Sequence, residues 1–481
     1  MPNTSERKQA IVIGGGIAGL TACYRLTVEA QKRSIPLNVK LLEAGERVGG
    51  VIHTSQQDGF IIEHGPDAFL SAKPGVKELC EELGIDAQWL GTNPKERRSF
   101  VLRKGKLCAV PEAFYMMAPA AWLPFLKTPI FSWGGKLRMA LELFIPRTRT
   151  DTDESVAHFV KRRLGTEAYQ RIAQPMIGGI YTADAEDLSL KATVPQFLEM
   201  EQTHRSIIKA LIARKKQSKQ TASSTSGPRY SLFLSFKSGM QTLTDTLAER
   251  LPDDCIQLNA KVTCVEHRVA DAGWRIHIDN QPVLNADLVC IALPAHQTSK
   301  VLERSVPELA KHLADIPYAS SARVNFAFRR EDVGHPLNGM GFIVPEIEGR
   351  SILGCTFSSV KFEGRAPTGQ VLLRVSIGGA LQSELLQQSE PDLIALALKE
   401  VRELLGVTGE PIFSVFSQHP EAMAQYHVGH LGLVSQIETH AQQLPDFALA
   451  GNAYRGIGIP DCITSGNRAA RSLIDALPTV C

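Results

Sequence analysis

The feature that most constrains the fold is a glycine-rich segment near the start of the chain, within the sequence AIVIGGGIAGL. Residues 10–13 form an apolar run that predicts a short buried strand, and residues 20–26 predict a helix. Between them stand Gly14, Gly16 and Gly19 in G-x-G-x-x-G spacing. This spacing permits a tight turn, a close backbone approach to a pyrophosphate and close packing of the helix on the strand. The segment therefore predicts a dinucleotide-binding site.

The residues that follow the motif indicate which dinucleotide binds. A second apolar run, residues 39–42, ends in Glu43, where the fold uses an acid to bind a ribose hydroxyl pair. Arg47, Gly49 and Gly50 come directly afterwards, where an NAD-binding protein normally continues into another helix. A second glycine turn beside a basic residue suits a longer ligand, whose pyrophosphate and isoalloxazine ring run on across the sheet. The sequence therefore favours FAD over NAD.

Length and composition are those of an ordinary globular protein. At 481 residues the chain is too long for one core, so two or three domains are expected. The net charge of +2 gives no indication of nucleic-acid binding. Nine cysteines without a C-x-x-C pair or metal-ligand spacing predict free thiols in a reducing cytoplasm and no metal site. The polar start lacks the apolar core of a signal peptide, and no run of 18 apolar residues predicts a spanning helix.

The first half of the chain is predicted to be mostly helical beyond the opening motif. Residues 73–83 have apolar side chains at helical spacing, and residues 99–110 predict a hairpin. Residues 153–200 predict several helices, with a break at the glycine pair 178–179. Residues 111–146 combine many aromatic and methionine side chains with prolines. We expect this segment to be buried in a helical domain; the alternatives are a roof over an apolar cavity and a surface that touches a membrane.

The second half predicts a further sheet and a return to the opening fold. Residues 213–228 are polar, basic and low in complexity, which predicts a loop with solvated charges, or with weak attraction to an anionic membrane or substrate. Residues 317–377 alternate apolar and polar side chains, which predicts an antiparallel sheet in a second domain. The chain closes with a strand at 447–450, a glycine-rich turn and a helix at 461–473. This is the same order of elements as in the opening motif. We therefore predict an α/β fold (α+β overall) with a Rossmann-like FAD-binding domain assembled from separated segments, a substrate domain with a mixed or antiparallel sheet, and a helical subdomain.

Several long blocks of the sequence resemble one family. GGGIAGL, LLEAGERVGG, KSGMQTL and AGNAYRGIGIPDCITSG are similar to the flavin-containing amine oxidase superfamily. GFIIEHGPDAFL, IGGIYTADAEDLSLKATVPQFLEMEQTHRS, MAQYHVGH and GIGIPDCI resemble, within it, the porphyrinogen oxidases of haem biosynthesis, which act on protoporphyrinogen or coproporphyrinogen. The bacterial members look most similar, and the resemblance covers nearly the whole chain.

We expect three domains on this basis. The FAD-binding domain would comprise residues 7–52, 229–297 and 441–481. The substrate-binding domain would comprise residues 53–84, 186–228 and 298–440. Residues 85–185 would form the helical domain, which is the candidate for membrane association.

The resemblance also implies site residues. The implied cofactor contacts are Gly14, Gly16, Ile17, Ala18, Gly19, Glu43, Ala44, Gly50, Val51, Gly65, Pro66, Asp67, Ala68, Val262, Gly458, Ile459 and Pro460. The implied substrate contacts are His64, Gly178, Ile180 and Met340. Candidate cations for substrate carboxylates are Arg97, Arg98, Lys361 and Arg365. No catalytic base is expected, because the cofactor accepts the hydride and aromatisation drives the reaction; the nearest titratable residues are Glu63, His64 and Asp67.

The implied activity is a six-electron oxidation of a porphyrinogen to a porphyrin, in three steps, with dioxygen as oxidant and hydrogen peroxide as product. Coproporphyrinogen III, with four carboxylates, is slightly favoured over protoporphyrinogen IX, with two. Expected partners are the porphyrinogen and dioxygen, with handover of product to a ferrochelatase as a further candidate and no nucleic acid. We expect a monomer or homodimer in the cytoplasm, with peripheral contact to the inner face of the cell membrane as the open alternative.

The sequence departs from the family pattern at two places. Family members often carry a cation directly before the Gly-Pro pair at 65–66, where this chain has His64, whose ordinary pKa lies near neutrality. A tryptophan commonly stands near the YHVGH block, where this chain has His419. The alternatives are an amine oxidase, which would need an aromatic cage that is not visible here, a carotenoid desaturase, which would lack the specific blocks, and a non-enzymatic flavin-binding protein.

Overall fold

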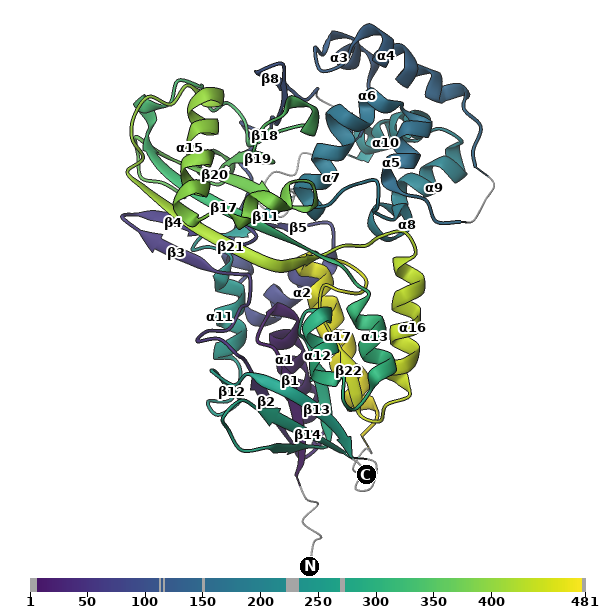
Figure 1. Ribbon diagram of the computed structural model, residues 1–481, viewed down its shortest axis with the longest axis vertical. Coiled ribbons are helices and arrows are strands. Elements are labelled where there is room, and N and C mark those ends of the chain that lie inside the picture. The colour runs from purple at the N-terminus through teal and green to yellow at the C-terminus, as the bar shows by residue number, and fades with distance from the viewer. Residues whose placement is uncertain are drawn as a thin grey trace, which may run out of the picture.

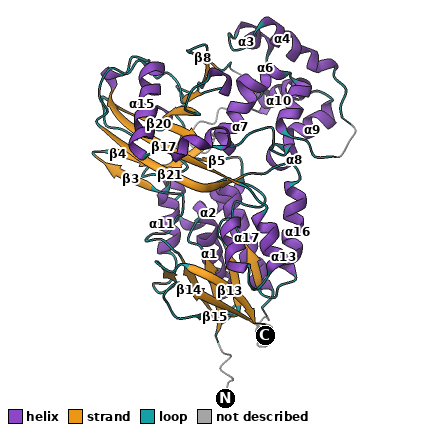
Figure 2. Ribbon diagram, in the orientation of Figure 1, coloured by secondary structure: helices purple, strands orange, loops and turns teal. Residues whose placement is uncertain are grey.

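The computed structural model describes residues 7–111, 114–115, 117–148, 152–221, 233–268 and 273–477. Figure 1 shows a lower body built around a parallel sheet, with a large sheet above it on the left and a lobe of helices above it on the right. Figure 2 shows that the strands are confined to the lower body and the upper left, apart from short pieces. This arrangement confirms the predicted mixed α/β fold.

The lower body is organised around a five-stranded parallel sheet. Its strands, in spatial order, are β12 (Ile256–Gln257), β2 (Leu37–Leu42), β1 (Lys8–Ile13), β16 (Leu288–Ile291) and β22 (Phe447–Leu449). These strands come from three distant parts of the sequence and pair in parallel register. Both faces of the central strand are buried, so it reads as a continuous apolar run rather than as an alternating pattern.

Helices cover one face of the parallel sheet, and a small sheet with further helices covers the other. The first face packs on α1 (Ile17–Lys32), α2 (Pro74–Leu83), α11 (Gln241–Glu249) and α17 (Ile459–Asp475). The second face packs on the antiparallel strands β13 (Val262–Arg268), β14 (Gly273–Ile278) and β15 (Leu284–Ala286), and on α12 (Ala295–Leu302), α13 (Pro307–Ala314) and α16 (His430–Gln442). Helices α1 and α17 approach so closely that a Cβ atom on Gly466 would lie 2.3 Å from the carbonyl oxygen of Ala18.

The upper left part is a seven-stranded mixed sheet. Its strands, in spatial order, are β21 (Phe413–Ala424), β17 (Tyr318–Arg329), β20 (Gln370–Gly378), β19 (Gly354–Phe357), β18 (Gly341–Ile343), β7 (Phe100–Arg103) and β8 (Lys106–Ala109). One face carries Ala322, Val324 and Phe326 and packs on the apolar side of α15 (Glu390–Leu405). The opposite face carries Ser321, Arg323 and Asn325 in the same strand, as period-two alternation requires.

The upper right lobe consists of short helices. They are α3 (Trp122–Lys127), α4 (Trp133–Ala140), η2 (Leu141–Phe144), α5 (Val156–Arg163), α6 (Thr166–Ala168), the π-helix η3 (Tyr169–Ala173), α7 (Gln174–Tyr181), α8 (Leu190–Thr193), α9 (Pro195–His204) and α10 (Ile207–Thr221). A fully buried ion pair between Arg163 and Glu142 lies inside the lobe, where Glu142 also accepts a hydrogen bond from the Ile207 amide at 2.8 Å. In the part of the chain that the structure describes, no helix is long and apolar enough to cross a bilayer.

Short elements connect the three parts. They include the hairpin β3 (Thr54–Gln57) and β4 (Phe60–Glu63), the small sheet of β5 (Phe69–Leu70), β11 (Phe233–Phe236) and β6 (Trp89–Gly91), and the pair β9 (Phe114–Tyr115) and β10 (Ala118–Pro119). The remaining turns of helix are η1 (Asp86–Gln88), η5 (Arg330–Asp332), η6 (Glu346–Glu348), α14 (Ser358–Lys361) and η7 (Ala380–Gln387).

Two local predictions were wrong. The glycine pair 178–179 does not break a helix, because α7 continues through it and ends at Tyr181, followed by Thr182 in the left-handed conformation. Residues 213–221 are not loop but the end of α10, whose apolar start at 207–211 packs in the helical lobe, while residues 222–228 lie outside the described part. In both places tertiary packing outweighs a weak local preference. The structure also places 100–109 in the large sheet and packs 190–211 with the helical lobe.

Candidate active site

The glycine motif forms an open cradle between β1 and α1. Gly14 has a φ of +104°, and a Cβ on Gly19 would lie 1.9 Å from the Gly14 carbonyl oxygen, so both positions need glycine for the fold itself. Gly16 differs, because a Cβ there would meet no atom of the chain within 4 Å. Gly16 is also the N-cap of α1, with no side-chain cap. The space beside Gly16 therefore adjoins an uncapped helix N-terminus, which favours an anionic group such as a pyrophosphate.

The carboxylate of Glu43 is fixed at the end of β2, against the same turn. Its Oε2 atom accepts a hydrogen bond from the Gly15 amide at 2.7 Å, and its Oε1 atom accepts one from the Gly45 amide at 2.8 Å. A carboxylate has about four lone-pair sites, so two backbone bonds leave acceptors for a hydroxyl pair. This position fits the expected ribose contact.

The second glycine turn folds over the first. The Gly49 amide donates to the Gly15 carbonyl oxygen at 2.8 Å, and a Cβ on Gly50 would lie 3.3 Å from the Gly16 Cα atom. Arg47 stabilises this turn rather than facing a phosphate, because its guanidinium donates to the carbonyl oxygens of Gly50 and Ile52 at 2.7 and 3.0 Å. The two turns together form the cradle that an extended dinucleotide requires.

The remaining expected cofactor residues lie around this cradle. Val262 is buried at the start of β13, and Gly458, Ile459 and Pro460 begin α17, where the Gly458 amide donates to Asp461 at 3.2 Å. Ala44 is exposed, and Val51 is 48% exposed although it is apolar. Because the carboxyl ends of parallel strands meet at one edge, β1, β2 and β22 present their following turns to the same side of the sheet. These residues fit an FAD.

The segment after β4 is held against the polar face of the seven-stranded sheet. His64 Nδ1 lies 2.7 Å from the Ser417 hydroxyl, and His419 Nε2 donates to the His64 carbonyl oxygen at 2.8 Å. Asn325 Nδ2 donates to the Glu63 carbonyl oxygen at 3.3 Å. Strands β17 and β21 therefore fix residues 63–67, which include four of the expected contacts, between the lower body and the large sheet.

Asp67 carries the negative charge of this segment. Lys361 Nζ lies 2.8 Å from Asp67 Oδ2, and Arg374 Nη1 lies 3.7 Å from the same oxygen. Burial raises the pKa of Asp67, but Lys361 and Arg374 outweigh burial and hold that pKa well below its usual value. Asp67 is therefore a permanent counter-ion at neutral pH and is unsuited to act as a base.

His64 is uncharged at neutral pH. Its Nε2 atom lies 2.8 Å from the Ser55 hydroxyl, and its ring stacks on that of His53 with centroids 4.2 Å apart. Burial, followed by His53 and Arg47, lowers the pKa of His64 to about 4. Burial also lowers the pKa of His419, and the nearby Arg323 acts in the same direction. His64 therefore has no positive charge for a substrate carboxylate, and both of its ring nitrogens are bonded to serine hydroxyls.

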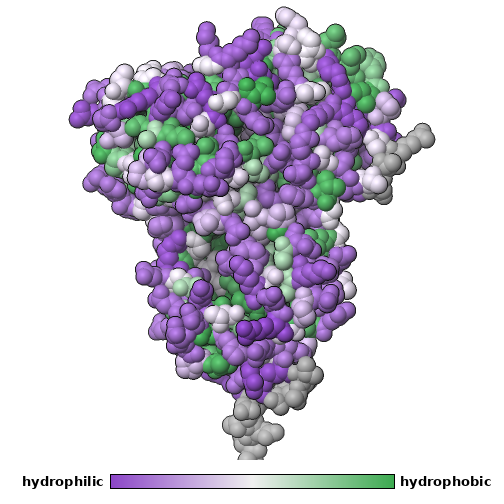
Figure 3. Space-filling view, viewed as in Figure 1, coloured by the Kyte–Doolittle hydropathy of each residue, from purple (hydrophilic) through white to green (hydrophobic). Residues whose placement is uncertain are grey.

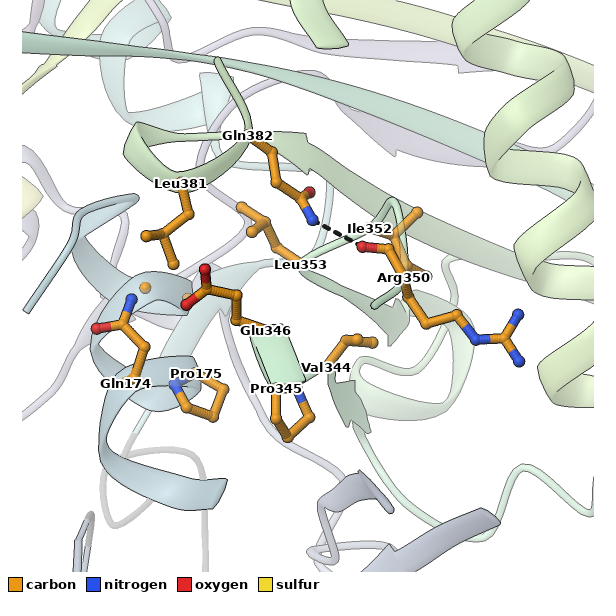
Figure 4. Close-up of a pocket in the computed structure, with 12 residues that line it drawn as sticks. Gln174, Pro175, Val344, Pro345, Glu346, Arg350, Ile352, Leu353, Leu381 and Gln382 are labelled. Carbon is orange, nitrogen blue, oxygen red and sulfur yellow. Dashed lines mark hydrogen bonds between the residues drawn. The ribbon is translucent and has the colours of Figure 1, made fainter. Parts of the chain in front are cut away.

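The expected substrate-wall residues lie on neighbouring elements of the upper part. Gly178 and Ile180 belong to α7, which contacts β18, and Met340 directly precedes that strand. Ile180 is 46% exposed. A cavity of about 20 Å³ separates α7 from the sheet, and Figure 4 shows Gln174 and Pro175 of α7 facing Val344 and Glu346 across it. This volume holds a water molecule and no tetrapyrrole, so the cavity itself is not a substrate pocket.

Two of the four candidate cations are already bonded within the protein. Lys361 pairs with Asp67, and Arg365, whose side chain is 2% exposed, donates to Ser235 and to the carbonyl oxygens of Phe236 and Lys237. The other two, Arg97 and Arg98, are exposed.

Two arginines that the sequence reasoning missed, Arg323 and Arg374, stand on the polar sheet face instead. The alternation in residues 322–328 could have indicated Arg323, because it shares a strand face with Asn325.

Comparison with known proteins bears on this geometry. Residues 17–474 match the family model described as flavin containing amine oxidoreductase. The chain belongs to this family. It is 32% identical to the coproporphyrinogen III oxidase of Bacillus subtilis (strain 168), over 98% of this chain and 99% of the relative. It is also 32% identical to the protoporphyrinogen oxidase of Bos taurus, over 98% and 99%. A crystal structure named "Putative protoporphyrinogen oxidase" from Exiguobacterium sp. 255-15 superposes with a TM-score of 0.84 at 27% identity, covering 97% of this chain and 99% of that one.

Family membership confirms three of the predictions. The chain is an oxidoreductase, its cofactor is FAD, and the resemblance to porphyrinogen oxidases within the flavin-containing superfamily holds over the full length. The individual contacts assigned to cofactor and substrate stay predictions. The structure places most residues assigned to the cofactor at the ends of β1 and β2 and at the starts of α1, β13 and α17. Residues 64–68 follow β4, Gly178 and Ile180 belong to α7, and Met340 precedes β18.

Proposed function

We propose that this protein oxidises a porphyrinogen to the corresponding porphyrin, with coproporphyrinogen III favoured over protoporphyrinogen IX. The observation that carries the proposal is full-length similarity to relatives named for these two reactions. The open cradle at Gly16 and the polar sheet face that covers residues 63–67 support it. The favoured substrate has four carboxylates, and the cations on this face suit an anionic ligand.

The cradle would hold FAD through the elements already described. The α1 N-terminus would bind the pyrophosphate, Glu43 the ribose, and the start of α17 the flavin end. When bound, FAD supplies the acceptor for a hydride from a methylene bridge and passes the electrons to dioxygen. Three such steps remove three hydrides and three pyrrole protons, consume three dioxygen molecules and release three hydrogen peroxide molecules. A tautomerisation then moves a proton from the fourth methylene bridge to a pyrrole nitrogen, which gives the porphyrin with two N–H groups.

The protein residues position the substrate and exclude water. His64 would present an uncharged ring, and α7 with the segment before β18 would supply apolar walls through Ile180 and Met340. We propose that the parallel-sheet body, built mainly from residues 7–52, 229–297 and 441–481, binds FAD. The large sheet and the helical lobe would then enclose the substrate against it.

An aerobic assay with each porphyrinogen tests the proposal. We expect porphyrin fluorescence to rise well above the rate without enzyme, with three dioxygen molecules consumed per porphyrin. The rate with coproporphyrinogen III should exceed that with protoporphyrinogen IX. A Gly16→Val variant that lacks FAD is the control for autoxidation. Rates equal to this control with both substrates would contradict the proposal.

We further propose a cytoplasmic enzyme whose helical lobe touches the membrane surface. Exposed apolar side chains gather on α3, α4 and η2, among them Leu123, Trp133, Leu137 and Phe144, at 72, 74, 65 and 75% exposure. Leu123 and Trp133 line an open groove of about 690 Å³, together with the exposed Lys127. Figure 3 shows apolar residues at the upper right, over the region of α4 in Figure 1. Exposed apolar side chains beside a lysine suit an anionic bilayer surface.

Vesicle sedimentation tests this contact. We expect the protein to sediment with vesicles that contain anionic lipid more than with purely zwitterionic vesicles. A Trp133→Asp/Leu137→Asp variant should lose binding while it keeps porphyrinogen oxidation. Equal sedimentation of wild type and variant would contradict the proposed surface.

A further inference from the structure

The polar face of the large sheet carries two arginines, Arg374 and Arg323, that share a single nearby acid, Asp67. Arg374 on β20 lies opposite Asn325 on β17, and Arg323 lies two residues before Asn325 on that strand. Side chains of residues two apart in a strand share one face, so both guanidinium groups belong to the face that covers residues 63–67. Burial and the nearby Arg374 lower the pKa of Arg323 to about 9.

Arg374 lacks hydrogen-bond partners for part of its guanidinium. Its side chain is 11% exposed, and its Nε and Nη1 atoms are shielded from solvent without a hydrogen-bond acceptor among the described residues. Asp67 is 3.7 Å from Nη1, beyond hydrogen-bonding distance, because Lys361 already occupies that oxygen at 2.8 Å. Buried donors without acceptors are costly, so this position favours an added acceptor, either a water molecule or an anionic group.

The charge balance points to an anion. Around Asp67 and Glu63 the described residues place four cations, which are Lys361, Arg365, Arg374 and Arg323. Burial raises the pKa of Glu63, which weakens the negative side further. Burial is the main cause that lowers the pKa values of His64 and His419, so neither histidine adds positive charge. Two positive charges are left without a counter-ion on one side of the segment 63–67.

The place of Arg374 in the sheet relates it to the expected substrate wall. Thr356 on β19 pairs with Arg374 on one side and with Gly341 on β18 on the other. Strands lie about 4.8 Å apart, so the Arg374 backbone is roughly 10 Å from that of Gly341, next to Met340. A flat ligand that covers Met340 and reaches residues 63–67 would therefore bring a peripheral group to Arg374.

We propose that Arg374, assisted by Arg323, binds a carboxylate of the substrate. The proposal rests on the proposed porphyrinogen oxidation and adds the residues that recognise the acidic side chains. A guanidinium binds a carboxylate through two parallel hydrogen bonds along one of its edges, either Nε with Nη2 or Nη1 with Nη2. Each of these edges of Arg374 includes one donor without a partner among the described residues, Nε or Nη1. Arg365 and Lys361 do not serve this purpose, because their donors are occupied within the protein.

Binding of coproporphyrin III, the stable tetracarboxylate, and of its tetramethyl ester tests the site without turnover. Arg374→Met should weaken binding of the acid about 10- to 100-fold, the effect of losing a charged hydrogen-bonding pair. Binding of the ester should change less than threefold. Arg374→Lys should recover part of the loss, because it keeps the charge without the planar fork. Arg329→Met, at the exposed end of β17, is the matched control and should bind both ligands as wild type does.

Kinetics with coproporphyrinogen III give a second measurement. Arg374→Met should raise KM at least tenfold with kcat nearly unchanged, and Arg323→Met should change KM in the same direction by a smaller factor. FAD content and thermal unfolding establish that each variant is folded; if Arg374→Met does not fold, Arg323→Met and Arg374→Lys decide the question.

Equal losses for acid and ester, or a fall in kcat alone, would overturn the carboxylate site and assign the charge to the flavin. Absence of oxidation by the wild type would overturn the proposed function instead, while the comparison of acid and ester binding would still decide this site.

Discussion

His419 donates a hydrogen bond from Nε2 to the carbonyl oxygen of His64, at 2.8 Å. These are the two positions at which the sequence departs from the family pattern, and they lie 355 residues apart. The contact joins β21 of the large sheet to the segment that follows β4. The two departures are therefore one local change, in which a pair of neutral histidines stands beside cations that come from the sheet.

The first prediction concerns the pH dependence of stability at His64. Its pKa is lowered to about 4 in the folded protein, mainly by burial, whereas an unfolded histidine has a pKa near 6.5. Between these values the unfolded chain binds more protons, so stability is complete above pH 6.5 and falls as the pH drops toward 4. We expect His64 to account for about 1–2 kcal/mol of this loss, because solvent screens a half-buried ring.

Urea unfolding at pH 7.5 and pH 5 measures this effect. The variant His64→Gln should lose less stability between the two pH values than wild type does. His204→Gln, at the exposed end of α9, should follow the wild type. An unchanged pH dependence in His64→Gln would show that this ring does not titrate as stated.

A second prediction separates the cofactor role of Gly16 from the structural role of Gly19. A Cβ on Gly16 meets no protein atom within 4 Å, so Gly16→Val should fold normally but block the pyrophosphate and lose FAD. A Cβ on Gly19 would lie 1.9 Å from the Gly14 carbonyl oxygen, so Gly19→Ala should destabilise the apoprotein itself. The measurements are the flavin-to-protein absorbance ratio and the thermal unfolding of each apoprotein. Full FAD retention in Gly16→Val would contradict the placement of the site.

A third prediction concerns the contact of α1 with α17. A Cβ on Gly466 would lie 2.3 Å from the Ala18 carbonyl oxygen, so Gly466→Ala should push the two helices apart and cost about 1–3 kcal/mol. Both helices begin at the cofactor cradle, so FAD affinity should fall as well. Gly432→Ala in α16 is the control, because its Cβ meets nothing within 4 Å and the substitution should be neutral or slightly stabilising. Calorimetry with and without FAD measures the melting temperatures of both variants. Equal melting temperatures for Gly466→Ala and Gly432→Ala would refute the close packing.

A fourth prediction concerns the buried ion pair of the helical lobe. Arg163 and Glu142 are both fully buried, and Arg163 Nε donates to Glu142 Oε1 at 3.1 Å. Arg163→Met alone should destabilise the lobe by about 3–5 kcal/mol, because it leaves Glu142 as an unpaired buried charge. Arg163→Met/Glu142→Leu should recover much of this loss. Hydrogen exchange in α5 and α10 reports on the lobe directly, and Arg455→Met, from an exposed pair with Glu438, should leave it unchanged.

The local signals in the sequence predicted much of the fold. The opening strand and helix, the hairpin at 99–110 and the long strands 318–329 and 370–378 have strong periodicity or turn residues, and the structure contains all of them. The predictions failed where the local signal was weak. The glycine pair 178–179 is held in α7, and the basic stretch after residue 207 continues as α10, because each helix starts from an apolar surface of the lobe.

Sequence alone determined the cofactor and the family, because a glycine motif, an acid at the end of the next strand and long matching blocks depend on local order along the chain. Tertiary structure decided which charges face the site. Lys361 and Arg365 read as free cations in the sequence, but folding pairs one with Asp67 and surrounds the other with carbonyl oxygens. Arg374 reads as an ordinary strand residue, yet strand register places it over residues 63–67 with unused donors. Burial and charge pairing depend on residues that are far apart in the sequence and meet only in the folded protein. Local sequence patterns therefore do not predict which charged side chains are paired.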